Sequence, residues 1–148
     1  TQWPFLLMSF KSTIHSSYSL DSSLSSLQEE NPVLLNPRDA QRLKIKQGDR
    51  VKISTPAGSI NSAVLIDPGV KSGVLAIEHG FGHRDLGART IIINGTKIPG
   101  NPHARHGVNL NEIGLTDPTR KGTTLWVNSV SGACVRNGIP AKIEVQKV

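Results

Sequence analysis

Three irregular segments of this 148-residue chain carry the residues that could bind a polar ligand. Residues 12–26 hold eight serines and one threonine; the other two segments are His79-Gly80-Phe81-Gly82-His83 and Gly107-Val108-Asn109-Leu110-Asn111. Hydroxyl groups and closely approaching backbone amides bind phosphate oxygens. An asparagine amide donates and accepts hydrogen bonds within one group. The segments therefore indicate recognition of an oxygen-rich ligand.

Each segment also has a plainer interpretation. The serine-rich stretch has the composition of a flexible linker, which could still become ordered on binding. Asn109 and Asn111 could cap turns in a long loop. His79 and His83 have the i, i+4 spacing of helical metal ligands, but the glycines between them disfavour a helix. Arg136-Asn137 could reach a ligand or form a surface turn.

The sequence shows no catalytic set. Ser, His and Asp residues are plentiful but lack a nucleophile-elbow context. Gly58-Ser59 also occurs as the self-cleaving pair of aspartate decarboxylases, yet here it is expected in a hairpin turn. The single cysteine, Cys134, excludes an internal disulfide and a cysteine-built iron–sulfur or zinc site.

The net charge of +6 favours anionic partners or simply gives a solvated basic surface. The positive residues are scattered, and aromatic residues do not alternate with them. The stacking platform of a single-strand nucleic-acid binder is therefore missing. No apolar run approaches the roughly 20 residues that a membrane span needs.

The elements expected to position the three segments are mostly strands, because fourteen glycines and nine prolines indicate many turns. A helix is expected over residues 37–44, with Asn36 as its N-cap and Pro37 in its first turn. Asn94-Gly95 after three isoleucines predicts a hairpin, and residues 99–122 a long ordered loop. A closed barrel would leave few free edges. The expected strands cover residues 4–10, 33–35, 51–54, 59–66, 73–78, 91–93, 123–127 and 141–148.

The order of elements within residues 36–82 resembles the C-terminal domain of the dimethyl sulfoxide reductase family of molybdenum and tungsten oxidoreductases. The resemblance extends over residues 4–148. It implies a mostly β fold, a six-stranded double-psi β-barrel with two or three short helices. It also implies that residues 1–148 form a single domain that caps the cofactor of a larger catalytic subunit. The first residue is Thr rather than Met, which suggests a processed chain or a fragment.

The resemblance implies a bis-molybdopterin guanine dinucleotide cofactor, whose molybdenum or tungsten is held by other domains. In many members the first strand ends in Thr-Gly-Arg. Here Lys11 or Ser12 replaces the Gly-Arg, which weakens the carry-over of a guanidinium contact and leaves backbone amides, His15 and Ser16 as candidate contacts. Asn109 corresponds to the residue that contacts the pterin. No catalytic residue or metal ligand is expected. The candidate cofactor-binding residues are Lys11, Ser12, His15, Ser16, Ser17, His79, Gly80, Gly82, Asn109, Asn111, Asp117 and Arg136.

The parent enzyme implied by the resemblance catalyses two-electron redox chemistry in anaerobic respiration, and the fragment alone should be inactive. Residues 108–111, 117–122 and 130–133 look like the large subunits of the tetrathionate reductase group, with its thiosulfate, polysulfide and arsenate relatives. The resemblance implies that such large subunits lie outside the cytoplasmic membrane. It also implies two partners, an iron–sulfur electron-transfer subunit and a membrane anchor subunit, through which the large subunit is associated with the membrane. Neither nucleic-acid binding nor direct membrane insertion is expected.

A binding module is the alternative interpretation. Double-psi barrels also form the N-terminal recognition domains of some unfolding ATPases, where the positive charge would serve a protein or polyanion partner. A basic nucleic-acid binder is a third interpretation, and salt-dependent DNA binding would reveal it.

Overall fold

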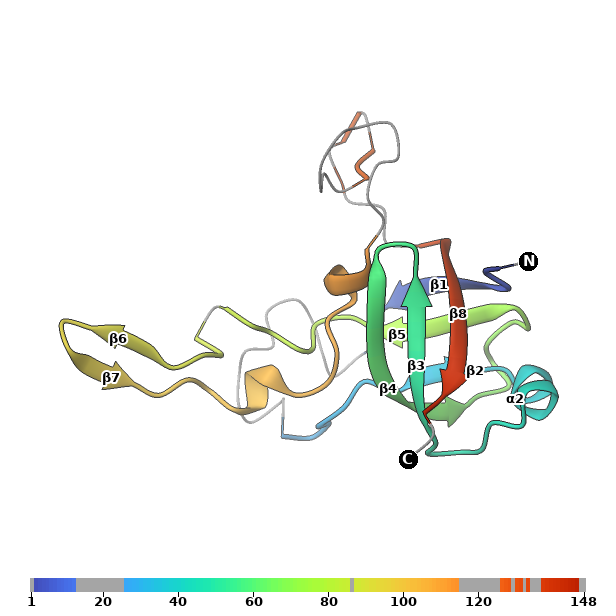
Figure 1. Cartoon of the computed structure of the whole chain (residues 1–148), viewed down its shortest axis with the longest axis horizontal. Coiled ribbons are helices and arrows are strands. Elements are labelled where there is room, and N and C mark those ends of the chain that lie inside the picture. Colours follow the sequence, from blue (N-terminus) through green and yellow to red (C-terminus); the bar gives the residue numbers. More distant parts are fainter. Residues whose placement is uncertain are drawn as a thin grey trace.

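Six strands close a barrel in the order β1-β5-β2-β4-β3-β8 (Figure 1). The structure, a computed structural model, describes residues 2–12, 26–85, 87–114, 126–128, 130–131, 133 and 137–146. The barrel strands are β1 (Phe5–Phe10), β2 (Val33–Leu35), β3 (Arg50–Thr55), β4 (Gly58–Ile66), β5 (Val74–Glu78) and β8 (Ile139–Val145).

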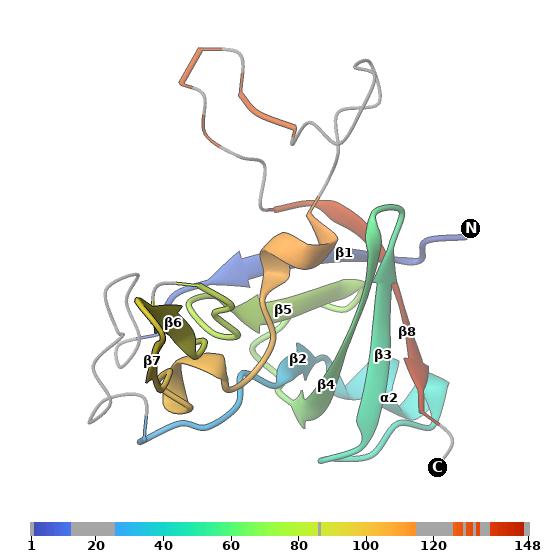
Figure 2. The ribbon, with the colours of Figure 1, turned by 60° about the vertical axis from the view of Figure 1, so that its left-hand side comes forward.

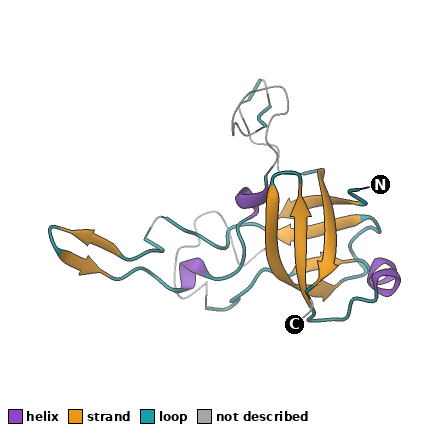
Figure 3. Cartoon of the chain, viewed as in Figure 1, coloured by secondary structure: helices purple, strands orange, loops and turns teal. Residues whose placement is uncertain are grey.

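The remaining elements lie outside the barrel wall. Strands β6 (Ile91–Ile93) and β7 (Thr96–Ile98) form a separate two-stranded sheet. One α-helix, α2 (Pro37–Leu43), and two 3-10 helices, η1 (His103–Arg105) and η2 (Leu110–Ile113), complete the described elements (Figure 3). None of the helices in the described ranges has the length and apolar character of a membrane span.

Two parallel strand pairs distinguish this barrel from a simple meander. Strand β1 pairs in parallel with β5, and β2 pairs in parallel with β4, whereas the other neighbours are antiparallel. This interleaving confirms the predicted double-psi barrel. The register of the first pair sets Phe10 opposite Glu78, so β1 and β5 end side by side.

The core is aliphatic, as a chain with 4% aromatic residues suggests. In β4, buried and more exposed positions alternate, because successive side chains of a strand point to opposite faces. Ile113 of η2 is fully buried and joins the same core. Thr55 Oγ1 donates to the Ile113 carbonyl oxygen at 2.9 Å. The largest fully buried hydrophobic side chains are Phe5, Leu7, Val33, Leu35, Val51, Ile53, Val64, Leu75, Ile77 and Ile113.

Helix α2 follows the predicted capping pattern. The Asn36 side chain accepts a hydrogen bond from the Arg38 backbone N–H at 2.8 Å, and Pro37 occupies the first turn. Asp39 is only 2% exposed. Its carboxylate accepts one bond from Arg42 at 2.7 Å and one from the Gly73 backbone N–H at 2.7 Å. Asp39 therefore ties the helix to the turn that leads into β5.

Replacing Asp39 by Ala is expected to lower the free energy of unfolding by about 2–3 kcal/mol, because the partly buried Gly73 N–H loses its charged acceptor. Urea unfolding followed by circular dichroism measures the change. Arg42→Ala is the control, since the Arg42 side chain is 59% exposed and an exposed ion pair contributes about 0–1 kcal/mol. Equal losses in the two variants would contradict the role given to the Gly73 contact.

Most predicted strand positions are confirmed, with two differences. The last strand begins at Ile139 rather than Ala141, because Ile139 already pairs with Leu7 of β1. The strand expected over residues 123–127 falls mainly on residues outside the described ranges, and β8 alone completes the described barrel. The predicted hairpin forms but stays outside the barrel.

Candidate functional site

Two of the predicted ligand-binding segments begin next to each other, because the parallel strands β1 and β5 end side by side. The His79 backbone N–H donates to the Phe10 carbonyl oxygen at 3.1 Å, directly beyond the strand pair. Glu78, only 4% exposed, accepts from the Ser12 N–H at 3.3 Å and from Gln28 Nε2 at 3.0 Å. Lys11-Ser12 and His79-Gly80 therefore leave the barrel next to each other.

Asn31 fastens the third segment to the end of β5. Its side chain is buried, and Nδ2 donates to the Glu78 carbonyl at 2.7 Å and to the Val108 carbonyl at 2.9 Å. Its Oδ1 accepts from the Val108 N–H at 2.8 Å. One amide thus joins the barrel to the loop that carries Asn109, by bonds that a buried polar group needs.

Glycine lets the second and third segments touch through their backbones. The Gly82 N–H donates to the His106 carbonyl at 2.8 Å, and the His83 N–H donates to the Ala104 carbonyl at 2.9 Å. Gly82 has φ +65°, and a Cβ there would lie 2.6 Å from the Asn109 nitrogen. The structure therefore brings together two segments that the sequence singled out separately.

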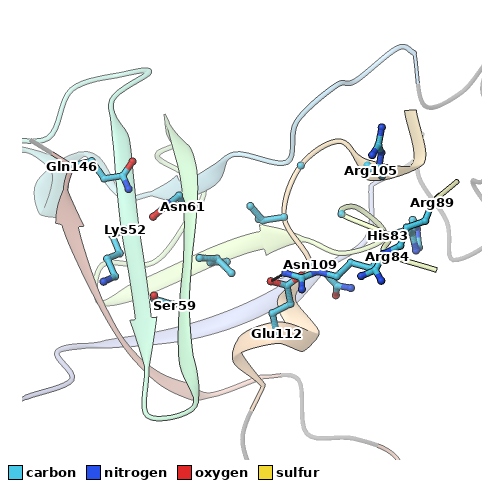
Figure 4. Close-up of a pocket in the computed structure, with 14 residues that line it drawn as sticks. Lys52, Ser59, Asn61, His83, Arg84, Arg89, Arg105, Asn109, Glu112 and Gln146 are labelled. Carbon is cyan, nitrogen blue, oxygen red and sulfur yellow. Dashed lines mark ion pairs between the residues drawn. The ribbon is translucent and has the colours of Figure 1, made fainter. Parts of the chain in front are cut away.

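A pocket of about 720 Å³ lies between these loops and the outer face of β3 and β4 (Figure 4). Figure 4 shows that Lys52 and Asn61 come from the strands, Arg84 and Arg89 from the loop after β5, and Arg105 from η1. Lys52 and Asn61 are cross-strand neighbours. The described lining is Lys52, Ser59, Ile60, Asn61, Gly82, His83, Arg84, Arg89, Arg105, Gly107, Val108, Asn109, Glu112 and Gln146.

The charge of this pocket is positive. Its described lining holds one lysine and three arginines against one carboxylate, Glu112. Glu112 is already paired with Arg84 at 2.7 Å. Lys52, Arg89 and Arg105 therefore carry charge that Glu112 does not balance, and a partly enclosed cationic pocket of this kind binds anions.

The structure divides the predicted site residues into three groups. Gly82 and Asn109 line the main pocket, and Asn111 lines a neighbouring pocket of about 420 Å³ that shares Asn109. Lys11, Ser12, His79 and Gly80 lie where β1 and β5 end and are not part of either lining. His15, Ser16, Ser17, Asp117 and Arg136 fall outside the described residues.

Asn109 caps a turn and also lines the main pocket. Its Oδ1 accepts from the Asn111 N–H at 3.0 Å and caps η2, as the turn-capping interpretation predicts. This bond uses the carbonyl end of the side chain. The amino end remains for a ligand in the pocket that Asn109 lines.

The two histidines around Gly80 and Gly82 lie in a loop, as the glycines predicted. Gly80 and Gly82 have φ +103° and +65°, values that exclude a helix between the histidines. His83 Nε2 lies 2.9 Å from the Gly80 carbonyl oxygen. Within the described ranges, no three His, Cys, Asp or Glu side chains gather as metal ligands would.

The wall of the pocket was not predicted from the sequence. Arg84, Arg89 and Arg105 look in the sequence like scattered charges, and Lys52 and Asn61 like the solvated face of a strand. The one usable signal was the alternation of residues 51–54, which indicates that Lys52 points away from the core. Asn31, the buried fastening residue, carried no recognisable pattern.

A family model described as "Molydopterin dinucleotide binding domain" matches residues 7–129. A tetrathionate reductase subunit of Salmonella typhimurium is 47% identical over 144 residues, 97% of this chain and 14% of that protein. A selenate reductase subunit of Mesobacillus selenatarsenatis is 37% identical over 112 residues, 67% of this chain and 11% of that protein. The chain thus spans a small part of the curated relatives it matches.

Solved structures support the fold. Acetylene hydratase from Pelobacter acetylenicus superimposes with a TM-score of 0.67 and 20% sequence identity. The match covers 97% of this chain and 18% of the hydratase. At this level of identity the similarity speaks for the barrel and its appended loops.

Proposed function

The chain belongs to the molybdopterin dinucleotide-binding domain family of the dimethyl sulfoxide reductase-type oxidoreductases, and on this premise we propose that it caps a molybdopterin guanine dinucleotide. In this proposal residues 1–148 are one cofactor-capping domain of a larger catalytic subunit. The other domains of that subunit hold the metal, and the domain alone is inactive. Its role is to bind and orient the cofactor, which supplies the two-electron redox chemistry when bound.

The observation that carries the proposal is the cationic pocket next to Asn109. A pyrophosphate needs positive charge and N–H donors, and the pocket offers Lys52, Arg89 and Arg105. A pterin edge needs a group that both donates and accepts, and Asn109 is such a group. The glycine at position 82 keeps the backbone free of a side chain beside Asn109. The residues of the described site therefore fit the cofactor.

The predicted residues at the ends of β1 and β5 complete the proposed site. Lys11, Ser12, His79 and Gly80 begin loops that leave the barrel together. We assign them to the cofactor's edge outside the main pocket, through backbone amides and hydroxyls. The sequence also predicts cofactor contacts by His15, Ser16, Ser17, Asp117 and Arg136, which lie outside the described residues.

The parent enzyme is proposed to be a reductase of an anionic sulfur or oxyanion substrate, such as tetrathionate. The support is that relatives named tetrathionate, selenate and arsenate respiratory reductase subunits match most of this chain. In this proposal the parent subunit lies outside the cytoplasmic membrane. Its partners are an iron–sulfur electron-transfer subunit and a membrane anchor subunit.

The test uses two substitutions of Asn109 in the full-length catalytic subunit. Asn109→Ser keeps a side-chain acceptor that can cap η2 but removes the amide donor, whereas Asn109→Ala removes both. Both variants are expected to lose roughly tenfold in cofactor affinity, the effect of about 1.4 kcal/mol. Molybdenum and pterin contents, after dialysis of the purified protein, measure this loss.

The thermal midpoint separates the two roles of Asn109. Asn109→Ser should unfold close to the unmodified protein, while Asn109→Ala should unfold earlier. If Asn109→Ser retained all of its molybdenum, the residue would be a cap only and the proposed pterin contact would be wrong. A full-length enzyme purified without any molybdopterin would overturn the proposed function as a whole.

A further inference from the structure

The two-stranded sheet projects away from the barrel as an arm, which we call the isoleucine arm (residues 91–98) (Figures 1 and 2). All six of its strand residues are exposed. Ile91, Ile92, Ile93 and Ile98 are exposed by 48%, 74%, 51% and 42%. Such a concentration of exposed isoleucine is unusual for a surface in water and marks a site of contact.

The pairing sorts the arm into two faces. Ile91 lies opposite Ile98, Ile92 opposite Lys97, and Ile93 opposite Thr96. Because side chains alternate along a strand, Ile91, Ile93 and Ile98 share one face. Ile92 and Lys97 share the other. Three-residue strands without a covering layer are marginal in water, so the arm needs a partner for its apolar face.

The base and tip of the arm give it a defined direction. The Asn101 N–H donates to the Gly87 carbonyl at 2.8 Å, which closes the base. Gly100 packs so closely on the Ala88-Arg89 backbone that no Cβ would fit there. At the tip, Asn94 and Gly95 have φ +49° and +80°, which suits a tight hairpin turn. The arm is therefore a preformed projection.

The charge of the arm indicates the chemical character of the surface that could cover it. Residues 91–98 carry one charged residue, Lys97, and contain no Asp or Glu. The complementary surface is an apolar groove edged by carboxylates. A second copy of the arm is a poor partner, because it would bring two Lys97 side chains together. Two pairs of three-residue strands would also bury much less than the roughly 1,200–2,000 Å² of a stable interface.

We propose that the isoleucine arm inserts into a carboxylate-edged apolar groove on the part of the catalytic subunit outside these 148 residues. This inference rests on the proposed function, which places the chain in a longer subunit. The relative that matches 97% of this chain extends far beyond it, because the match is 14% of that protein. A groove on the same polypeptide covers the isoleucines as soon as the subunit folds, whereas a separate protein would leave an aggregation-prone edge exposed until assembly.

A photo-crosslinking amino acid at position 93, on the apolar face of the arm, identifies what covers that face in the full-length enzyme with its partner subunits. After irradiation, mass spectrometry is expected to place the crosslink within the catalytic subunit, outside the 148 residues. A crosslink to another subunit, a crosslink to a second copy, or no crosslink would overturn the inference.

A matched pair of substitutions gives an independent readout in the same enzyme. Ile98→Asn is expected to lower the thermal midpoint by roughly 2–4 °C relative to Leu65→Asn. Leu65 is an exposed leucine of β4 with 38% exposure, close to the 42% of Ile98. Equal midpoints would contradict the inference. Molybdenum content distinguishes failure of this inference from failure of the proposed function. If the enzyme contains molybdenum but the crosslink lies elsewhere, the inference about the arm is wrong and the proposed function stands.

Discussion

Replacing Asn31 by Asp is expected to destabilise the domain by about 3–5 kcal/mol, the range for an uncompensated buried charge. The change keeps the shape of the side chain and its bond from the Val108 N–H. It replaces the Nδ2 donor with an oxygen that faces the Glu78 and Val108 carbonyl oxygens, now at 2.7 and 2.9 Å from the nitrogen. Two hydrogen bonds become two repulsive contacts around a side chain that is 1% exposed.

The loss should also appear in the cofactor content of the full-length enzyme, because Asn31 holds the loop that carries Asn109. Chemical unfolding and molybdenum content are measured together. The control is Asn128→Asp, which makes the same change at an exposed asparagine whose Oδ1 accepts from the Val130 N–H. It should stay within about 0.5 kcal/mol of the unmodified protein. Similar behaviour of both variants would show that Asn31 is not the fastening residue.

Replacing Gly82 by Ala is the second substitution with a large expected effect. The new Cβ would lie 2.6 Å from the Asn109 nitrogen and 2.8 Å from the Val108 carbonyl carbon. These are backbone atoms, and the hydrogen bonds between Val108 and Asn31 oppose their displacement. We expect a loss of about 1–3 kcal/mol from overpacking, added to the cost of a left-handed alanine, and a lower molybdenum content.

Gly87→Ala separates the contact from the backbone conformation. Gly87 has φ +83°, comparable with the +65° of Gly82, but a Cβ at position 87 would meet nothing within 4 Å. It should cost only the roughly 1–2 kcal/mol of a left-handed alanine. Both variants are compared by thermal unfolding and molybdenum content. If the two lost equal stability and equal molybdenum, the close approach of Gly82 to Asn109 would carry no function.

The barrel strands, the helix and the hairpin could be predicted because each is encoded locally. Alternation in residues 51–54, the cap at Asn36 and the turn at Asn94-Gly95 act over a few residues. The closed order of the strands is not local in this sense. It came from the resemblance of the pattern over residues 36–82, since the parallel partners Phe10 and Glu78 are far apart in sequence.

Only part of the candidate site could be predicted, because the fold brings most of its residues together from distant parts of the sequence. Asn109 and Gly82 belong to recognisable loop segments, but Lys52 and Arg105 look like any exposed cation until the fold places them around one pocket. Asn31 stands before Pro32 and has the appearance of a turn residue. Its burial depends on three backbone groups from distant segments, which no local pattern encodes.

The burial of Ile113 couples ligand binding in the pocket to the folding stability of the barrel. This residue ends the short helix that Asn109 caps, and it is part of the hydrophobic core. A ligand that binds only the folded domain raises its stability by mass action. Genetic screens for enzymes that lose their cofactor should therefore recover substitutions deep in the barrel. A larger cellular supply of the cofactor should rescue these core substitutions. It should not rescue substitutions of the residues that contact the cofactor in the pocket.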